Sequence, residues 1–250
     1  MSSDLVIILP DGSERHLAPE STGADLAADI GGRAAREALI AVADGIQIDL
    51  DTALPNNSQV SLIFGNSEEG TEVLRHSTAH VLAQAVLSLY PGATFSIGPP
   101  IQDGFYYDFD LPGDQTFNDD DLAAIESKMR EIVGRKQPFI RSEVDRAAAN
   151  ELFADHPYKL EILDGEADDP MSGPEGGVIT TYRNTDDFVD LCRGPHVPDT
   201  GYLGHFKLMR VAGAYWRGDE KRQMLQRIYG TAWSSKKELK QHLERLEEAA

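Results

Sequence analysis

The chain has 250 residues, of which 41% are hydrophobic, and its formal net charge is −19. This length suggests one large or two ordinary domains with a packed core. The acidic balance is unfavourable for tight nucleic-acid binding, which needs Lys and Arg. One cysteine excludes an intramolecular disulfide and favours a cytoplasmic location. No apolar run reaches the ~18–20 residues of a membrane helix, and MSSDLVIILPDG lacks the basic start and long apolar stretch of a signal peptide.

Residues 4–64 predict a small α+β unit. LVIIL and SERHL flank the turn sequence Pro10-Asp11-Gly12, which is a strand–turn–strand pattern. Thr22 is the expected cap of a helix that Gly31-Gly32 ends. LIAVADG, IQIDL and QVSLIF predict further short strands. Four or five short strands around one helix are typical of a β-grasp module. It has no convincing catalytic cluster, because we expect its only histidine, His16, at the surface.

A polar break over residues 65–72 is expected to precede a long helix over 71–90, which Pro91-Gly92 ends. At about 100° per residue, one face of this helix gathers the predicted core residues. They are Leu74, Val81, Leu82, Ala85 and Leu89. His76 and His80 lie on the opposite side with uncharged neighbours, as in the wall of a cleft.

The remaining elements follow from composition and periodicity. Residues 95–112 are aromatic and strand-like, 119–136 and 142–156 predict helices, and 163–177 predict a flexible acidic loop. Residues 178–183 and 187–191 predict strands, and residues 205–216 predict a strand followed by a turn. Residues 234–250 predict a charged connector helix.

Two short motifs carry most of the chemistry. His76-Ser77-Thr78-Ala79-His80 reads HxxxH, and residues 190–196 read DxCxxxH around Cys192 and His196. The three imidazoles and the thiol could bind Zn²⁺ as a tetrahedron. Alternatively, the imidazoles could act as general bases on a water without metal. Cys192 could also be a nucleophile, or simply a small buried side chain.

Three other side chains have a functional and a structural interpretation. Asp190 shares one strand face with Cys192 and could hold an ammonium or orient an imidazole, or it could be an ordinary salt-bridge acid. Composition alone places Lys159 at the surface and Tyr107 in the core. Residues 205–230 have a net charge of +4 and are either solvated or a phosphate-facing patch. The basic residues of this stretch are Lys207, Arg210, Arg217, Lys221, Arg222 and Arg227.

Almost end to end, the chain resembles the N-terminal half of bacterial threonyl-tRNA synthetases. The resemblance rests on RHSTAHVLAQAV, GPPIQDGFYYDFD, DFVDLCRGPHVPDTG and FKLMRVAGAYWRGD…MLQRIYGTAW. It implies a ubiquitin-like TGS domain over 1–64, an α+β editing domain over 65–230, similar to that of alanyl-tRNA synthetases, and a connector helix over 231–250. The catalytic core and the anticodon-binding domain would follow that helix.

The resemblance also implies residue roles. His76, His80, Cys192 and His196 match the editing-site quartet, and Lys159 matches a catalytic lysine. Asp190 and Tyr107 match pocket residues. The expected reaction is hydrolysis of serine wrongly attached to threonine tRNA, without a required metal, although the alanyl relative uses zinc through the same pattern.

Within that reaction, we expect His76 to be the base and Lys159 to stabilise the oxyanion. The basic stretch should face tRNA, with weak, salt-sensitive binding. Because neither GxxxxGK[ST] nor GxGxxG occurs, the chain alone should not activate threonine. Two alternatives stay open: a zinc hydrolase of another ester or amide, and a non-catalytic tRNA-binding module.

Overall fold

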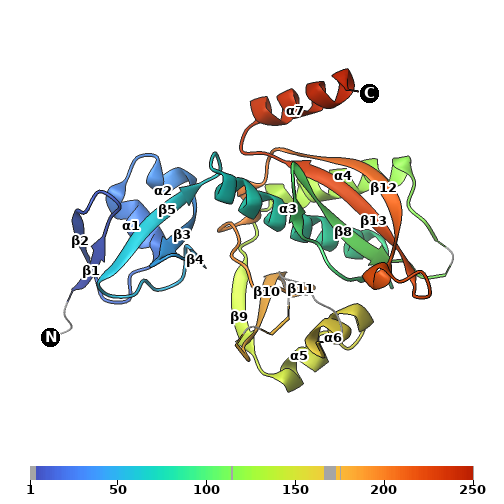
Figure 1. Cartoon of the computed structure of the whole chain (residues 1–250), viewed down its shortest axis with the longest axis horizontal. Helices are drawn as coiled ribbons and strands as arrows, with labels where there is room; N and C mark the ends of the chain where they lie inside the picture. Colours follow the sequence, from blue (N-terminus) through green and yellow to red (C-terminus); the bar gives the residue numbers. More distant parts are fainter. Residues whose placement is uncertain (1–3, 114, 166–172, 175, 250) are drawn as a thin grey trace. The chain divides into compact units, whose positions relative to one another are not determined.

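A computed structural model describes residues 4–113, 115–165, 173–174 and 176–249 (Figure 1). The chain forms two compact units. The first comprises Met1–Leu74 with Gly194–Pro198, and the second comprises Arg75–Arg193 with Asp199–Ala250. Most of the acidic loop predicted over 163–177 lies outside the described residues. Both units mix helices and strands, which confirms the α+β class.

The first unit is the predicted β-grasp fold. Its sheet has the order β2-β1-β5-β3-β4, in which β1 and β5 are parallel and the other neighbours are antiparallel. Ile7, Leu26 and Val60 are buried between sheet and helix. The elements are β1 (Leu5–Ile8), β2 (Glu14–Leu17), α1 (Gly23–Ile30), α2 (Ala34–Glu37), β3 (Ala38–Ala43), β4 (Ile46–Asp49) and β5 (Ser58–Phe64).

The ends of α1 follow from local chemistry, as predicted. The Thr22 side chain accepts a hydrogen bond from the Asp25 backbone N–H, and the Asp25 carboxylate accepts one from the Thr22 backbone N–H. This capping box satisfies two amides that the first helical turn leaves open. Gly31 ends the helix with a φ of 72°, a left-handed conformation that glycine adopts without a steric penalty.

The second unit contains two antiparallel sheets and most of the helices. One sheet has the order β12-β13-β8-β6 with β7 also paired to β8, and the other has the order β11-β10-β9. In Figure 1, α3 and α4 lie beside β8, β12 and β13, whereas α5 and α6 lie below β9–β11. The elements are α3 (Glu68–Leu89, of which the residues from Arg75 onward belong to this unit), β6 (Thr94–Phe95), β7 (Pro100–Ile101), β8 (Gly104–Asp110), α4 (Asp119–Gly134), β9 (Ile140–Val144), α5 (Arg146–Leu152), α6 (Pro157–Leu163), β10 (Ile179–Thr185), β11 (Phe188–Leu191), the 3₁₀ turn η1 (Thr200–Tyr202), β12 (Phe206–Tyr215), the 3₁₀ turn η2 (Trp216–Gly218), β13 (Met224–Ala232) and α7 (Lys236–Glu248).

Helix α3 differs from its prediction in two respects. It begins at Glu68 and not at 71, because the Ser67 hydroxyl accepts a hydrogen bond from the Gly70 backbone N–H (3.0 Å) and caps the first turn. The predicted core stripe is also wrong at Leu89, which is 40% exposed. Residues 76–86 are instead buried on every side of the helix. A single apolar stripe therefore describes only part of its packing.

Two other predictions need correction. The helix predicted over 142–156 starts only at Arg146, because residues 140–144 form β9 and pair with β10. Strand β13 was not predicted, although it is the central partner of both β12 and β8. The charged helix predicted over 234–250 is present as α7.

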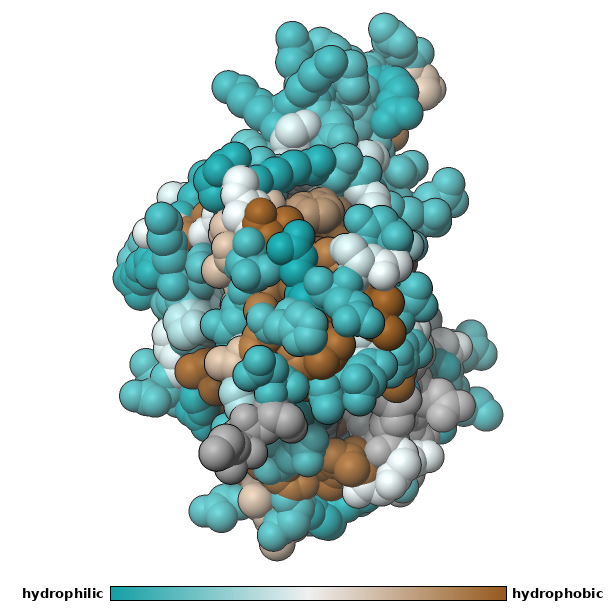
Figure 2. Space-filling view, turned by 90° about the vertical axis from the view of Figure 1, so that its left-hand side faces the viewer, coloured by the Kyte–Doolittle hydropathy of each residue, from teal (hydrophilic) through white to brown (hydrophobic). Residues whose placement is uncertain are grey.

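The surface agrees with the acidic, hydrophilic composition. The face shown in Figure 2 is mostly hydrophilic, with hydrophobic residues in small groups between polar ones. Among the helices that the structure describes, none has both the length and the apolar character needed to cross a membrane.

Candidate active site

Helix α3 carries the first two candidate residues into the interior. His76 and His80 are four residues apart, their ring centroids are 5.1 Å apart, and each is only 3% exposed. Cys192 directly follows β11, and its Sγ lies 3.2 Å from His76 Nε2. Burial and the neighbouring His80 lower the pKa of His76 well below its usual value, despite the opposing effect of Asp190. His76 is therefore neutral at physiological pH, and the same shift makes it a weaker base than an exposed imidazole.

A closed polar triangle lies in the same unit. Lys159 Nζ is 2.7 Å from Asp190 Oδ1 and donates to the Tyr107 hydroxyl at 3.0 Å. That hydroxyl in turn donates to Asp190 Oδ2 at 2.7 Å. All three side chains are 1% exposed, so the surface position predicted for Lys159 from composition alone is wrong. Helix α6 begins at Pro157, which places Lys159 in the first turn.

Asp190 links this triangle to the histidines. Its Oδ2 lies 3.5 Å from His80 Nε2. Burial alone would raise the pKa of Asp190, but the charge of Lys159, the His80 imidazole and hydrogen bonds from Lys159 and Tyr107 hold it below its usual value. The site therefore contains a buried carboxylate that stays ionised beside a buried ammonium.

Aromatic rings form one wall of this site. The Lys159 ammonium lies 4.7 Å from the centroid of the Phe95 ring, a cation–π contact. His156 packs edge-on against the same ring at 4.6 Å, and burial and the charge of Lys159 lower its pKa. Neither Phe95 nor His156 was predicted as a site residue. For His156, the only available signal was its position three residues before Lys159.

His196 is the one candidate of the quartet that belongs to the first unit. It is buried, and its backbone N–H donates to Asp49 Oδ1 at 2.8 Å. The other three members of the quartet lie together in the second unit. Their potential ligand atoms are within 4.8 Å of one another, and two imidazole nitrogens and a thiolate form a donor set that suits Zn²⁺.

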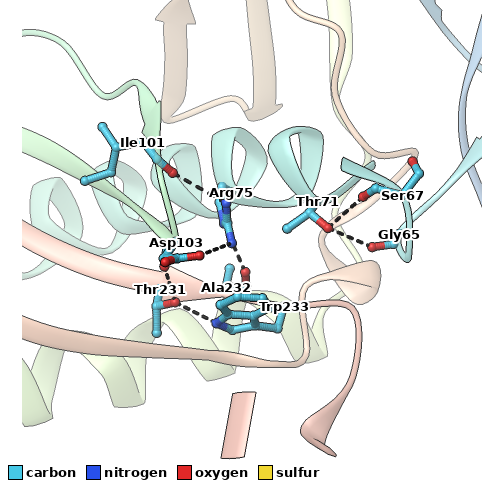
Figure 3. A network of polar contacts seen from close by, with 9 residues as sticks. All are labelled: Gly65, Ser67, Thr71, Arg75, Ile101, Asp103, Thr231, Ala232 and Trp233. Atoms are coloured by element: carbon cyan, nitrogen blue, oxygen red, sulfur yellow. Dashed lines mark hydrogen bonds and ion pairs between the residues drawn. The ribbon is translucent and has the colours of Figure 1, made fainter. Parts of the chain in front are cut away.

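Helix α3 is anchored near His76 by Arg75 (Figure 3). The Arg75 guanidinium donates to the Ala232 carbonyl (3.4 Å), lies 3.9 Å from an Asp103 carboxylate oxygen and stacks over Trp233 at 4.9 Å. Trp233 Nε1 donates to Thr231 Oγ1 at 2.7 Å. These contacts join α3 to the end of β13 and thereby help to orient the helix that carries the histidines.

The six basic residues predicted to face tRNA differ in their surroundings. Lys207 pairs with Glu126 (3.1 Å), and Arg222 pairs with Glu161 (2.9 Å). Arg227 forms two hydrogen bonds to Asp108, at 2.7 and 2.8 Å. The remaining three, Arg210, Arg217 and Lys221, are exposed.

Arginines and tyrosines alternate along one face of the β12–β13–β8 sheet. Arg210 stacks on Tyr229 at 3.9 Å, and Arg227 stacks on Tyr106 at 3.8 Å. The two tyrosine rings are 5.8 Å apart. Since side chains alternate across a strand, Tyr106 lies on the face opposite to Tyr107.

The chain matches two domain families and a set of curated relatives. Residues 5–64 match the TGS domain, and residues 179–229 match the "Threonyl and Alanyl tRNA synthetase second additional domain". Relatives named threonine–tRNA ligase include those of Rubrobacter xylanophilus (50% identical over 241 residues), Acidithiobacillus ferrooxidans (50% over 245) and Teredinibacter turnerae (49% over 246).

These matches cover 96–98% of this chain but only 36–37% of each relative. The homology supports an editing role associated with a tRNA synthetase. The chain is therefore homologous to one part of threonine–tRNA ligase, and it carries a TGS domain and the second additional domain of threonyl and alanyl tRNA synthetases.

Proposed function

We propose that this chain removes serine from wrongly charged threonine tRNA by hydrolysing the aminoacyl ester. The observation that carries the proposal is the buried Lys159–Asp190–Tyr107 triangle beside His76, His80 and Cys192. A buried ammonium and a neutral imidazole are suitable groups for acyl transfer to water. The homology to threonine–tRNA ligase supports an aminoacyl-tRNA as the substrate class.

The choice of serine follows from the limits of binding selectivity. Serine lacks one methyl group of threonine, and a difference of this size discriminates only ~10–200-fold. A second site that admits serine and rejects the extra methyl group raises the accuracy. We infer that Asp190 recognises the ammonium or the hydroxyl group of serine in that site.

The proposed reaction assigns a proton acceptor and a proton donor. A water oxygen attacks the ester carbonyl carbon while His76 takes one proton from that water. Lys159 stabilises the negative charge that develops on the carbonyl oxygen. When the bond to the ribose oxygen breaks, Lys159, the ammonium of the triangle, donates a proton to that oxygen. The proton that His76 took from the water then restores the charge of Lys159. The products are free serine and tRNA.

His80, Cys192 and His196 would shape and polarise the pocket. Cys192 Sγ lies 3.2 Å from His76 Nε2, a geometry in which an imidazole can also activate a thiol. We assign Cys192 a positioning role because the proposed reaction uses water as the nucleophile. We propose that His196, four residues farther along the chain, completes the quartet.

The direct test compares seryl- and threonyl-tRNA(Thr) as substrates of this chain. We expect faster hydrolysis of the seryl ester, and equal rates would contradict the proofreading proposal. His76→Ala and Lys159→Ala should each reduce the rate strongly. His16→Ala is the matched control, because His16 is exposed in the first unit.

A zinc-dependent hydrolase of another ester or amide is the second candidate. It is favoured by the three potential ligand atoms within 4.8 Å. A bound Zn²⁺ would be held by His76, His80 and Cys192, with His196 as a fourth ligand, and would activate water. Loss of hydrolysis with a chelator, and recovery with Zn²⁺, would select this candidate. A chain that binds tRNA without hydrolysing either ester would instead be a binding module.

We further propose that the alternating arginines and tyrosines contact the tRNA. Single-stranded nucleic acid binds to such surfaces by stacking on aromatic rings and by phosphate contacts with cations. Because the chain has a net charge of −19, we expect weak binding that falls with added salt. Nanomolar affinity at physiological salt would contradict this.

The parts of the relatives that this chain does not match would supply its partner domains. We infer that these are a catalytic core and an anticodon-binding domain, and that threonine activation requires them. An ATP–pyrophosphate exchange assay on this chain alone should therefore give no signal.

A further inference from the structure

A pocket lies where strands β12 and β13 meet at the turn η2. It has a volume of about 350 Å³ and is lined in part by Ile97, Asp108, Tyr215, Arg217 and Arg227. This volume is within the range of pockets that bind small organic groups. The lining includes no member of the quartet and no member of the Lys159–Asp190–Tyr107 triangle.

Arg217 is the distinctive side chain of this pocket. It is exposed, and within the part of the chain that the structure describes it forms no ion pair. Its φ is 57°, a left-handed conformation that is costly for a residue with a side chain. Such strain persists where the surrounding fold imposes it, and it is often found at functional sites. The turn thus holds an unpaired guanidinium at the pocket.

The other lining residues favour a planar, anionic ligand. Tyr215 is 45% exposed, which leaves its ring available for stacking. Arg227 is already neutralised by Asp108 through two hydrogen bonds, so Arg217 is the lining cation that can neutralise a bound anion. An exposed aromatic ring beside such a guanidinium suits a nucleotide, whose base stacks and whose phosphate accepts bidentate hydrogen bonds.

The pocket is close to the candidate active site along the chain. Asp108, which lines the pocket, directly follows Tyr107, which belongs to the Lys159–Asp190 triangle. Ile97 lies beside the same strand, since its carbonyl accepts a hydrogen bond from the Asp108 backbone N–H at 3.1 Å. The next residue, Gly98, packs directly on the Tyr107 ring. Neighbouring side chains point to opposite faces of a strand, so Asp108 and Tyr107 lie on opposite faces of β8. An RNA strand that ends at the triangle would therefore reach the pocket by passing around this edge of β8.

We propose that this pocket binds the nucleotide preceding the terminal adenosine of the tRNA, with Arg217 on its phosphate and Tyr215 under its base. This inference rests on the proposed function, because that function defines which nucleotide reaches the triangle. It assigns part of the recognition to the tRNA strand and not to the aminoacyl group. The pocket should consequently matter only for substrates longer than one nucleoside.

The test uses two substrates and one matched pair of variants. The substrates are seryl-tRNA(Thr) and 3′-O-seryl-adenosine, which lacks the preceding nucleotide. Arg217→Gly removes the guanidinium while glycine keeps the left-handed turn. Lys136→Gly is the control, because Lys136 is also an exposed cation with a positive φ, of 50°.

We expect Arg217→Gly to lower kcat/KM for seryl-tRNA(Thr) about tenfold or more, mainly through KM, as for the loss of a charged hydrogen bond. Hydrolysis of seryl-adenosine should stay at the wild-type rate, and Lys136→Gly should affect neither substrate. Equal losses on both substrates, or no loss on either, would overturn the inference.

A binding measurement separates this inference from the proposed function. Uncharged single-stranded RNA ending in CCA is titrated into wild type and Arg217→Gly at several salt concentrations. We expect weaker binding by the variant and a salt slope reduced by about 0.7, the value for one phosphate contact on a single strand. If the wild-type chain hydrolyses neither ester, the proposed function is wrong. The titration alone then tests whether the pocket binds RNA.

Discussion

Replacement of Lys159 by methionine tests the energetic core of the site. Lys159→Met keeps most of the side-chain volume but leaves the Asp190 carboxylate, 1% exposed, without its ammonium partner at 2.7 Å. Removing one member of a buried ion pair typically costs about 3–5 kcal/mol. We therefore expect a loss of this size in the free energy of unfolding of the second unit, together with loss of ester hydrolysis.

The assay is urea unfolding followed by tryptophan fluorescence. Both tryptophans, Trp216 and Trp233, belong to the second unit, so the signal reports the unit that contains the site. The control is Arg146→Met, which breaks an ion pair with Asp164 (3.3 Å) whose side chains are 46% and 63% exposed. Such a pair contributes at most about 1 kcal/mol.

A double variant distinguishes an unpaired charge from lost packing. In Lys159→Met with Asp190→Leu, no buried charge of this pair remains, so we expect most of the lost stability to return. The reasoning is refuted if Lys159→Met costs no more than Arg146→Met. It is also refuted if the loss of unfolding free energy in the double variant equals the sum of the losses in the two single variants.

Three further predictions concern the same site. Gly98→Ala should destabilise the chain by about 1–3 kcal/mol and impair hydrolysis, because the added Cβ would lie 2.1 Å from the Tyr107 ring. Gly134→Ala is the control, because its added Cβ meets no atom within 4 Å. Equal losses of unfolding free energy in the two variants, measured by denaturant unfolding, would contradict the prediction. The lowered pKa of Asp190 means that its stabilising contribution is complete above about pH 4, near the unfolded value of 3.8, and is lost as pH falls through the lower folded pKa. The difference in unfolding free energy between wild type and Asp190→Asn should therefore be constant above that pH and shrink below it, and a difference that grew on acidification would rule this out. Exhaustive treatment with a chelator should leave seryl-tRNA hydrolysis unchanged. Loss of hydrolysis, together with a bound zinc ion found by mass spectrometry in the untreated protein, would contradict this prediction.

Local signals predicted the first unit well because its elements are specified by nearby residues. Thr22 and Asp25 cap α1 within one turn, and Gly31 ends it. The strands of the β-grasp sheet are short and separated by clear turn residues. Each of these signals acts over a few positions, so the sequence alone is sufficient to read them.

The second unit was harder to predict because long-range packing decides it. Lys159 is polar by composition, and only the partner Asp190, 31 positions away in the printed sequence, explains its burial. Residues 142–144 were predicted as the start of a helix, but they belong to a strand because β10 pairs with them. The resemblance to a known family, and not the periodicity, pointed to Lys159, and no local pattern distinguished the surroundings of Arg217 from those of Arg222.

The buried cysteine makes the site accessible to chemical measurement. Cys192 is the only thiol of the chain and is 1% exposed. A thiol-modifying reagent can therefore reach the native protein only when the surroundings of Cys192 open, and the modification rate measures how often this happens. Because no other residue carries a thiol, this rate needs no correction for background labelling. A substrate analogue that closes the site should slow the labelling in proportion to its occupancy.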